Sequence, residues 1–505
     1  MADFAIEPNL YQEADDFLNF LDEPENAITG VSKAESTIFT SSAALQRYLG
    51  HGNTLSRLIR TLLPEEDRIL EPSLILTEYV AVFSTLVTFG HAHLLKRFVD
   101  SNFSDEKLPI LDKPRRFPKA QDGQDIFEAF FAAQWRFCPL EFRRDKVGVF
   151  VEPEQILPII SKELVTKTST VTTYKVTVHE DYDPFCEGNG SSILKTSKTL
   201  SQPKHTYLFK EFSGSNAQIA YEKELAAFLH LQKTGDIGKT IVNFYGSFIH
   251  DETRTIILEY GDRGSLADFF TRTHPPSTSE EVSTLWQAFL QIQKGLHAIH
   301  NIPRSGLQQA SEVLEYSVLR GWHQNIMPAN IMVVGGKSTS PFDCQFRIAN
   351  LATIEDQAAA SATLTENDLL SYMPQVYAAP ELYTEKSAGA LDITSNQKTD
   401  VWSLGCLFSE FAVWMVLGSA KLDEYREDRR QETVIFDVKN SGCFHDGQAG
   451  LPCVRLWNSK AIENKRSSDH VTKGILRQMV SEMLYENGDA RPTTTQLLTR
   501  ATDII

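Results

Sequence analysis

The chain has 505 residues, a length that favours more than one domain. Hydrophobic residues make up 42% and charged residues 23% of it, as in an ordinary soluble globular protein. The formal net charge of −17 argues against non-specific binding to nucleic acid or to an acidic membrane surface, because both need a basic face.

The six cysteines are scattered without a C-x-x-C pair, so neither a disulfide framework nor a zinc site is predicted. The first residues lack the basic-then-apolar order of a signal peptide. The longest apolar run, residues 79–89, is far shorter than the roughly 20 residues that span a bilayer. We therefore expect an intracellular protein, cytoplasmic or nuclear, with no membrane association.

Residues 1–40 are acidic and show little regular pattern. Asp15, Asp16 and Asp22 lie among scattered Phe and Leu residues. Such a segment is expected to be a flexible tail. The alternative is a short acidic and aromatic docking segment that folds on a partner.

Residues 41–150 have the periodicity of helices. Leu45, Tyr48 and Leu49 recur at helical spacing, and residues 79–87 repeat the pattern before Gly90 breaks it. This part of the chain is predicted to be an all-α N-terminal region.

Beyond that point the pattern alternates, and residues 165–178 are rich in β-branched residues that predict two strands. Strands followed by helices predict an α+β unit with two lobes, divided at about residue 260. The other expected elements are strands at 206–212, 241–248 and 255–260, and helices at 221–231 and 282–300.

The segment Gly321–Val333 resembles the catalytic loop of the protein kinase family, H-R-D-L-K-P-x-N followed by an apolar strand. The His, Pro and Asn of that motif are matched by His323, Pro328 and Asn330. Its Arg, catalytic Asp and Lys are replaced by Gln324, Asn325 and Met327. The frame of the loop is therefore present without its charged groups.

A second motif repeats this pattern. Phe346–Ala352 lies where the family has an apolar strand that ends in D-F-G, and Asn350 replaces the magnesium-binding Asp. Leu351 and Ala352 replace the Phe and the Gly.

Three further motifs imply structural roles in the same fold. They are Tyr377–Glu381 (A-P-E), Asp400–Cys406 (D-x-W-S-x-G) and Ala490–Thr493 (R-P-T). In the family, Glu381 would pair with Arg491, and Asp400 would accept backbone hydrogen bonds from the catalytic loop. The resemblance covers about residues 155–505, with an N-lobe at about 155–260 and a C-lobe at 261–505.

The resemblance also implies a nucleotide site. Lys210 would contact the α- and β-phosphates of ATP, and Glu224 would be its helix partner, with Glu222 as a competitor. Leu258 would be the gatekeeper, and backbone groups of Glu259 and Gly261 would face the adenine.

The phosphate loop departs from the family. Its glycine positions fall on Thr166, Thr168 and Val171, and these residues approach phosphates less closely than glycine does. Gly188 and Gly190 offer a rival, isolated G-x-G in a polar stretch.

The reacting groups depart as well. The Asn325 amide cannot take a proton at neutral pH. Met327 replaces the lysine whose positive charge would stabilise the transferring phosphoryl group. A metal would find only Asn330 and Asn350, whereas Mg²⁺ prefers carboxylates. Gln324 cannot pair with a phosphorylated activation segment as Arg would. Regulation is therefore not expected at Thr353, Ser361, Thr363 or Thr365.

The helical N-terminal region, Gly321–Gln324 and Phe444–Gly447 resemble a group of kinase-like proteins of filamentous fungi, which implies a fungal source. We expect a pseudokinase that acts as a scaffold or allosteric module for a protein partner, with ATP as a candidate ligand and at most weak Mg²⁺ contacts at Asn330 and Asn350. The alternative is an unconventional serine/threonine kinase that uses Lys210, Glu224 and Asn330.

Overall fold

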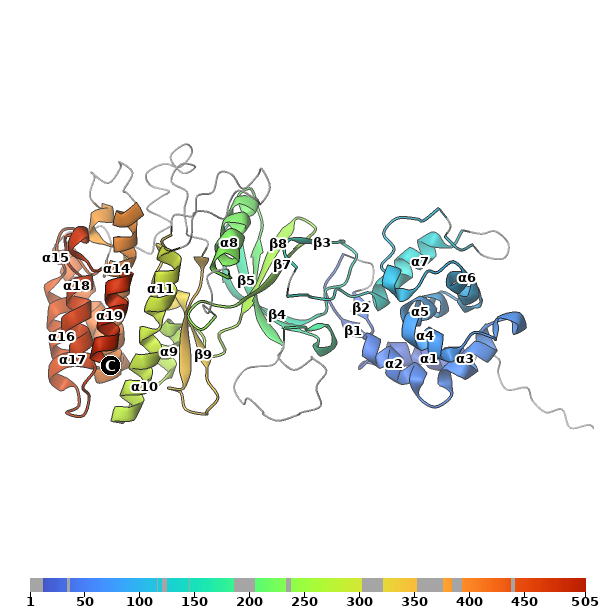
Figure 1. Cartoon of the computed structure of the whole chain (residues 1–505), viewed down its shortest axis with the longest axis horizontal. Coiled ribbons are helices and arrows are strands. Elements are labelled where there is room, and N and C mark those ends of the chain that lie inside the picture. Colours follow the sequence, from blue (N-terminus) through green and yellow to red (C-terminus); the bar gives the residue numbers. More distant parts are fainter. Residues whose placement is uncertain are drawn as a thin grey trace, which may run out of the picture. The chain divides into compact units, whose positions relative to one another are not determined.

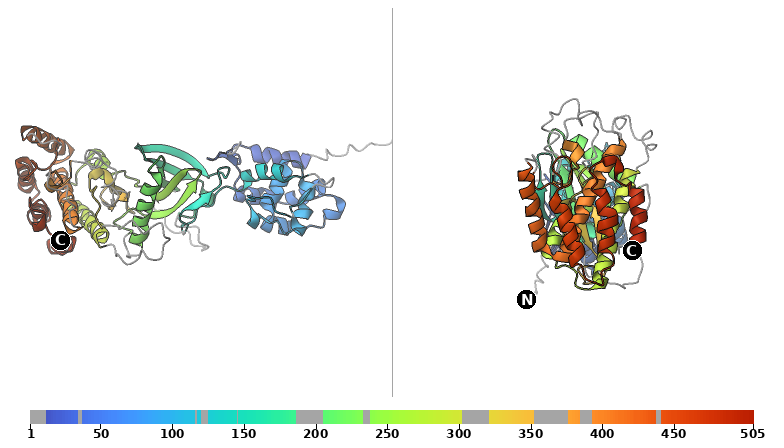
Figure 2. Two further views of the ribbon diagram at one scale, coloured as in Figure 1. Left: turned by 90° about the horizontal axis from the view of Figure 1, so that it is seen from above. Right: turned by 90° about the vertical axis from the view of Figure 1, so that its left-hand side faces the viewer.

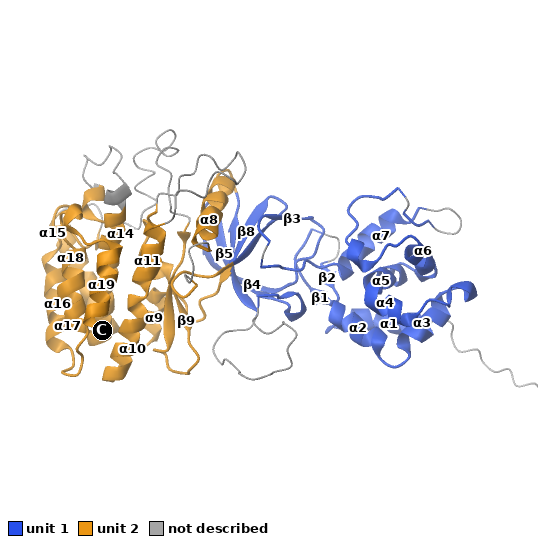
Figure 3. Ribbon diagram, in the orientation of Figure 1, with its two compact units in different colours: residues 1–192, 204–213, 245–257 blue, residues 193–203, 214–244, 258–505 orange. Residues whose placement is uncertain are grey.

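The structure is a computed structural model of the whole chain, and it divides into two compact units (Figure 3). Unit 1 comprises residues 1–192, 204–213 and 245–257, and unit 2 comprises residues 193–203, 214–244 and 258–505. The described residues are 12–33, 37–115, 117–119, 125–144, 146–185, 205–232, 238–301, 321–351, 376–383, 393–436 and 441–505.

The first part of unit 1 is a bundle of short helices, as predicted (Figure 1). At its centre lies α5 (Val80–Thr88), which is apolar on nearly all sides and almost wholly buried, as expected for a core helix. Gly90 ends this segment with a positive φ of 77°. The other helices are α1 (Gln12–Asp22), α2 (Ser42–Gly50), α3 (Thr54–Leu62), α4 (Pro72–Glu78), α6 (Leu95–Asp100) and α7 (Phe127–Gln134).

Helix α1 corrects, for residues 12–22, the expectation of a flexible tail over residues 1–40, of which residues 1–11 lie outside the described part of the chain. Phe17 and Leu21 on this helix are fully buried in the core of the bundle, and Phe20 stacks on Tyr48 with ring centroids 4.0 Å apart. Asp15, Asp16 and Asp22 are exposed, and the half-buried Glu13 forms an ion pair with Arg57 of α3. The aromatic and aliphatic residues of the segment therefore anchor α1 to the chain's own helices, in spite of the high charge.

A six-stranded sheet follows, in the spatial order β3-β7-β8-β6-β5-β4. The pairs β4–β5 and β5–β6 are antiparallel, and β3 lies parallel to β7. Strand β4 begins at Ile159, six residues before the predicted strand start. The strands are β3 (Val149–Val151), β4 (Ile159–Lys167), β5 (Val171–Val178), β6 (Thr206–Phe212), β7 (Phe244–His250) and β8 (Thr253–Glu259).

Unit 2 is mainly helical, with one antiparallel hairpin of β9 (Ile331–Gly335) and β10 (Cys344–Ile348). Its helices α14, α15 and α16 lie side by side (Figures 1 and 2). The helix predicted at 282–300 is two helices that meet at Gln291. The helices are α8 (Ala217–Gln232), α9 (Leu266–Arg272), α10 (Ser279–Leu290), α11 (Ile292–His300), α14 (Ile393–Leu417), α15 (Ser419–Ile435), α16 (Pro452–Asn464), α17 (Thr472–Ile475), α18 (Ser481–Met483) and α19 (Thr494–Ile504).

Helix α14 forms the core of unit 2. Its Phe411 stacks on Phe289 of α10 with ring centroids 3.6 Å apart. Among the described helices, residues Gln397–Leu417 alone are long and apolar enough to cross a membrane, but 89% of that window is buried inside the protein. The window is therefore explained by packing in the core. The α+β fold with an all-α N-terminal region is thus confirmed.

Candidate functional site

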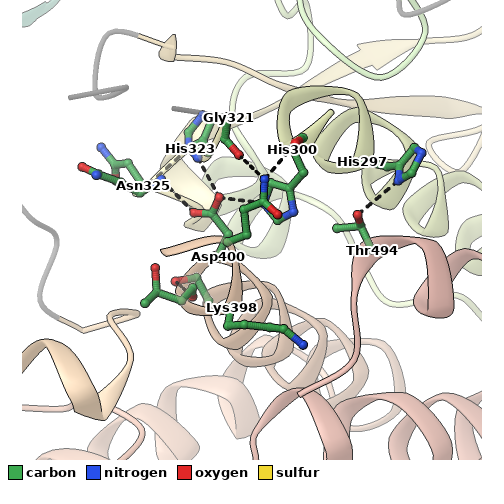
Figure 4. Close-up of polar contacts among 12 residues, drawn as sticks. His297, His300, Gly321, His323, Asn325, Lys398, Asp400 and Thr494 are labelled. Atoms are coloured by element: carbon green, nitrogen blue, oxygen red, sulfur yellow. Dashed lines mark hydrogen bonds and ion pairs between the residues drawn. The ribbon is translucent and has the colours of Figure 1, made fainter. Parts of the chain in front are cut away.

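Asp400 on α14 organises the loop that contains His323 (Figure 4). Its carboxylate accepts the backbone N–H of His323 at 2.6 Å and the backbone N–H of Gln324 at 2.7 Å. The Nε2 atom of His300 lies 2.9 Å from the same carboxylate. The predicted role of Asp400 is therefore confirmed, and this charged acceptor holds Gln324 at a positive φ of 64°.

His323 joins the loop to the end of β10. Its ring is fully buried, with Nε2 3.0 Å from the carbonyl oxygen of Ala349. Its Nδ1 accepts the backbone N–H of Asn325 at 3.2 Å. One ring nitrogen donates and the other accepts, which is the pattern of a neutral imidazole.

Three side-chain amides occupy the predicted catalytic and metal positions. The Nδ2 of Asn330 donates to the backbone oxygen of Asn325 at 2.9 Å. The Nδ2 of Asn350 donates to the Oδ1 of Asn330 at 3.4 Å. Oδ1 of Asn325 is buried and accepts no hydrogen bond within the described part of the chain. The structure thus brings the three predicted residues together.

This donor set does not fit Mg²⁺. The ion favours charged oxygens, whereas Asn325, Asn330 and Asn350 are neutral. The oxygen of Asn330 already accepts a hydrogen bond from the amide of Asn350. Over the residues that the structure describes, no group of three His, Cys, Asp or Glu side chains could hold a metal ion.

Met327 stands at the start of the turn Pro328–Asn330, where the related loop has a lysine. Its side chain is half-buried, and its backbone oxygen accepts the N–H of Asn330 at 2.9 Å. Met327 thus shapes the turn through its backbone, and its side chain brings no charge to the site.

The predicted adenine-facing segment follows Leu258. The backbone N–H of Glu259 donates to the oxygen of Asn243 at 2.9 Å, and its carboxylate forms a buried ion pair with Arg347. Burial raises the pKa of Glu259, although Arg347 acts in the opposite direction. At Gly261, a Cβ atom would lie 3.2 Å from the Cβ of Met332, so the segment runs close to β9.

The predicted phosphate loop is the β4–β5 turn in unit 1. The backbone N–H of Thr168 donates to the oxygen of Val171 at 2.8 Å. The N–H of Val171 donates to the Thr168 hydroxyl at 3.0 Å. These two amides are therefore used within the turn and do not point to a phosphate. The rival Gly188 and Gly190 lie outside the described residues.

Lys210 and Glu224 lie on β6 and α8, in different compact units. Lys210 is 7% exposed and Glu224 is fully buried. The competitor Glu222 is half-buried and accepts a hydrogen bond from Gln218 of its own helix at 2.9 Å. Burial therefore favours Glu224 over Glu222 as the functional carboxylate.

The predicted pair of Glu381 and Arg491 is present. Two guanidinium nitrogens of Arg491 donate to the two carboxylate oxygens of Glu381, at 2.6 and 2.9 Å. Arg491 is 1% exposed, so the pair fixes the chain near Glu381 to the end of unit 2. Ala352 and the segment positions Thr353, Ser361, Thr363 and Thr365 lie outside the described residues.

Sequence reasoning missed several buried charged groups, two of which lie in apolar elements. Arg347 lies in the apolar strand β10, and Glu410 lies in the apolar helix α14. Glu410 accepts hydrogen bonds from Arg426 at 2.7 Å and Arg429 at 2.6 Å, and from the Tyr377 hydroxyl at 3.0 Å. A lone charge in an apolar run was the available signal, because such a charge needs a buried partner.

A family model described as protein kinase domain matches residues 186–501, which is more than half of the chain. The matched region begins after the β4–β5 turn.

Three curated proteins illustrate the similarity. The mitogen-activated protein kinase kinase MST7 of Pyricularia oryzae is 25% identical over 316 residues, 62% of this chain and 61% of that protein. The serine/threonine-protein kinase flr-4 of Caenorhabditis elegans is 22% identical over 230 residues, 45% of this chain and 35% of that protein. The serine/threonine-protein kinase Nek8 of Danio rerio is 24% identical over 172 residues, which are 34% of this chain and 19% of that protein. The chain thus spans less than two thirds of each relative.

Proposed function

The chain belongs to the protein kinase family, and from this premise we propose that it is a pseudokinase. It keeps the kinase frame but transfers phosphoryl groups poorly, and it acts as a scaffold or an allosteric binding module. The observation that carries this proposal is the amide cluster of Asn325, Asn330 and Asn350. Every group at these positions is neutral.

The loss of the base supports this proposal. A general base contributes on the order of 10²–10⁴ in rate, and the amide of Asn325 has no basic atom at neutral pH. Its Oδ1 can accept a hydrogen bond from a hydroxyl group but cannot remove the proton. Asn325 could therefore orient a hydroxyl group but not activate it.

The hydrogen bond between Asn350 and Asn330 supports the loss of the metal. Mg²⁺ at this place would have to displace the amide donor of Asn350 from Oδ1 of Asn330. It would gain neutral oxygens in exchange for its water shell, which it gives up reluctantly. Phosphoryl transfer would then lack the ion that neutralises the developing charge.

The phosphate groups also lose two supports. In the turn Thr168–Val171, two backbone N–H groups form hydrogen bonds within the turn and are not available to a phosphate. Met327 supplies no positive charge. What remains for ATP is Lys210, Glu224 and the backbone at Glu259 and Gly261. We propose ATP binding without Mg²⁺ in an intracellular protein, cytoplasmic or nuclear, whose output is binding to a protein partner.

A second candidate is an unconventional serine/threonine kinase. The similar proteins include serine/threonine-protein kinases, which favours this activity by family likeness. Such an enzyme would use Lys210, Glu224 and Asn330 and would need an atypical metal arrangement.

The deciding experiment is phosphoryl transfer from γ-labelled ATP, with magnesium and with manganese, in wild type and Lys210→Ala. A pseudokinase gives the same background in both proteins. Label transfer that disappears in Lys210→Ala would refute the proposal and support the second candidate. Fluorescent-ATP binding to both proteins without divalent ions then tests the retained nucleotide site, and binding that is equal in both would exclude the role of Lys210.

A further inference from the structure

Unit 1 contains a cavity of about 540 Å³ between its helical bundle and its sheet. The bundle contributes Leu45 of α2 and Val80 of α5. The sheet contributes Phe248 of β7 and Ile257 of β8. This volume is that of a small-molecule site, and the lining presents apolar and polar surface in similar amounts.

The walls of this cavity are fixed by contacts on both sides. The backbone N–H of Leu140 donates to the oxygen of Ile156 at 2.9 Å. The hydroxyl of Tyr182 accepts the backbone N–H of Ser42 at 3.1 Å and so joins the sheet side to α2. The cavity is therefore bounded by hydrogen-bonded backbone and packed side chains, which resist collapse into the empty space.

Three carboxylates line this space, and Asp105 is the least exposed of them, since Glu106 and Glu141 are exposed. The two oxygens of Asp105 accept the backbone N–H groups of Ala81 and Val82, at 3.0 and 2.9 Å. No Lys, Arg or His within the described ranges forms an ion pair with it. Each carboxylate oxygen keeps further acceptor capacity after one hydrogen bond. Asp105 is thus a fixed, partly desolvated anion without a counter-ion.

Burial raises the pKa of Asp105 to about 6, against the lowering effect of the backbone N–H groups of Ala81, Val82 and Val80. At neutral pH the group is still mostly ionised, and its charge is costly in these surroundings. A ligand that brings a cation would relieve that cost.

From this arrangement we propose that the cavity binds an amphipathic amine, with its apolar body among Leu45, Val80 and Phe248 and its ammonium group on Asp105. Such a ligand complements both the apolar part of the lining and the half-buried carboxylate of Asp105. The proposal goes beyond the pseudokinase function and does not rest on it, since every wall belongs to unit 1.

The basic residues of the lining do not favour an anion instead. Lys146 is exposed, and the side chain of Arg143 is 60% exposed and lies 3.5 Å from Glu141. Exposed charges are screened by water and contribute little binding energy. Asp105 is half-buried and less exposed than any other charged residue of the lining, so its carboxylate decides the sign of the ligand.

The test is calorimetric titration of the full chain at neutral pH with three probes of one shape, phenylbutylamine, phenylbutanol and phenylbutyrate. The amine should bind at least about tenfold more tightly than the alcohol, because one such charge-assisted hydrogen bond is worth about 1.5–3 kcal/mol. The anion should bind most weakly. Equal affinities for the amine and the alcohol, or a preference for the anion, overturn the proposal.

Two variants localise the site. Asp105→Asn keeps an acceptor oxygen but removes the charge. The affinity for phenylbutylamine should therefore fall to that for phenylbutanol. Leu140→Trp fills the cavity from a half-buried position, so all binding should be lost. Thermal unfolding of both variants verifies that they fold. Unchanged amine affinity in either folded variant also overturns the proposal.

Discussion

The Nδ2 atom of Asn350 donates to the Oδ1 atom of Asn330 across 3.4 Å, so one amide occupies the oxygen that a metal ion would need from the other. The two residues are 20 positions apart in the chain and meet where the β10 strand ends beside the turn at Pro328. This contact replaces an ion by a neutral hydrogen bond.

Asn350→Asp should create a divalent-cation site. The carboxylate cannot donate to Asn330, so both side chains would present oxygens to an ion. We expect millimolar Mn²⁺ to raise the free energy of unfolding of the variant by about 1–2 kcal/mol and to leave wild type unchanged. Thermal unfolding with and without the ion measures this effect. Asn350→Gln, which stays neutral, is the control, and an equal shift in that control would contradict the interpretation.

Asp400→Asn should destabilise unit 2. The carboxylate accepts two backbone N–H groups and approaches His300, whereas an amide offers one oxygen and turns its own N–H groups toward a donor. One buried donor is then left unsatisfied, at a cost of about 2–4 kcal/mol in unfolding free energy. Urea denaturation measures this loss of unfolding free energy. The control is Asp503→Asn at an exposed position, whose free energy of unfolding should lie within about 0.5 kcal/mol of wild type. Equal behaviour of the two variants would remove Asp400 from its organising role.

Local spacing predicted the frame of the site well. Asp400 and the pair of Glu381 and Arg491 belong to motifs whose order along the chain predicts their roles, and the structure has both contacts. Strand β6 has the predicted bounds, Thr206–Phe212, because this short run is rich in aromatic residues, which favour strands.

Contacts between distant buried charges could not be predicted in the same way. Arg347 and Glu259 are 88 residues apart, and neither lies in a pattern that names the other. Helix α1 was missed for a different reason. Its acidic composition is typical of a disordered segment. However, Phe17 and Leu21, four residues apart, lie on one face of the helix and pack into the core of the bundle.

Phe17→Ala tests that α1 belongs to the folded bundle. The side chain is fully buried, so its removal should cost about 3–5 kcal/mol of unfolding free energy through lost burial and a cavity. Asn19→Ala on the exposed side of the same helix should change it by less than about 0.5 kcal/mol. Urea unfolding of both variants provides the comparison. If the segment were a flexible tail, neither substitution would alter the midpoint.

Glu410 should make stability fall in acid. Burial alone would raise its pKa, but the guanidinium groups of Arg429 and Arg426 outweigh burial and hold the pKa at about 2, below the ordinary 4.5. A depressed pKa contributes stability above the unfolded value, so this contribution is present above pH 4.5 and is lost as the pH falls through about 2. The shift corresponds to about 3 kcal/mol.

The measurement is the free energy of unfolding as a function of pH, for wild type and Glu410→Gln. The variant leaves Arg429, which is 2% exposed, without its anion, so it should lose about 3–5 kcal/mol at neutral pH. Because it lacks the titrating group, it should lose about 3 kcal/mol less than wild type on acidification. Parallel pH profiles for the two proteins would mean that the carboxylate is not held ionised by the two arginines, and the acid sensitivity would then have to come from other carboxyl groups.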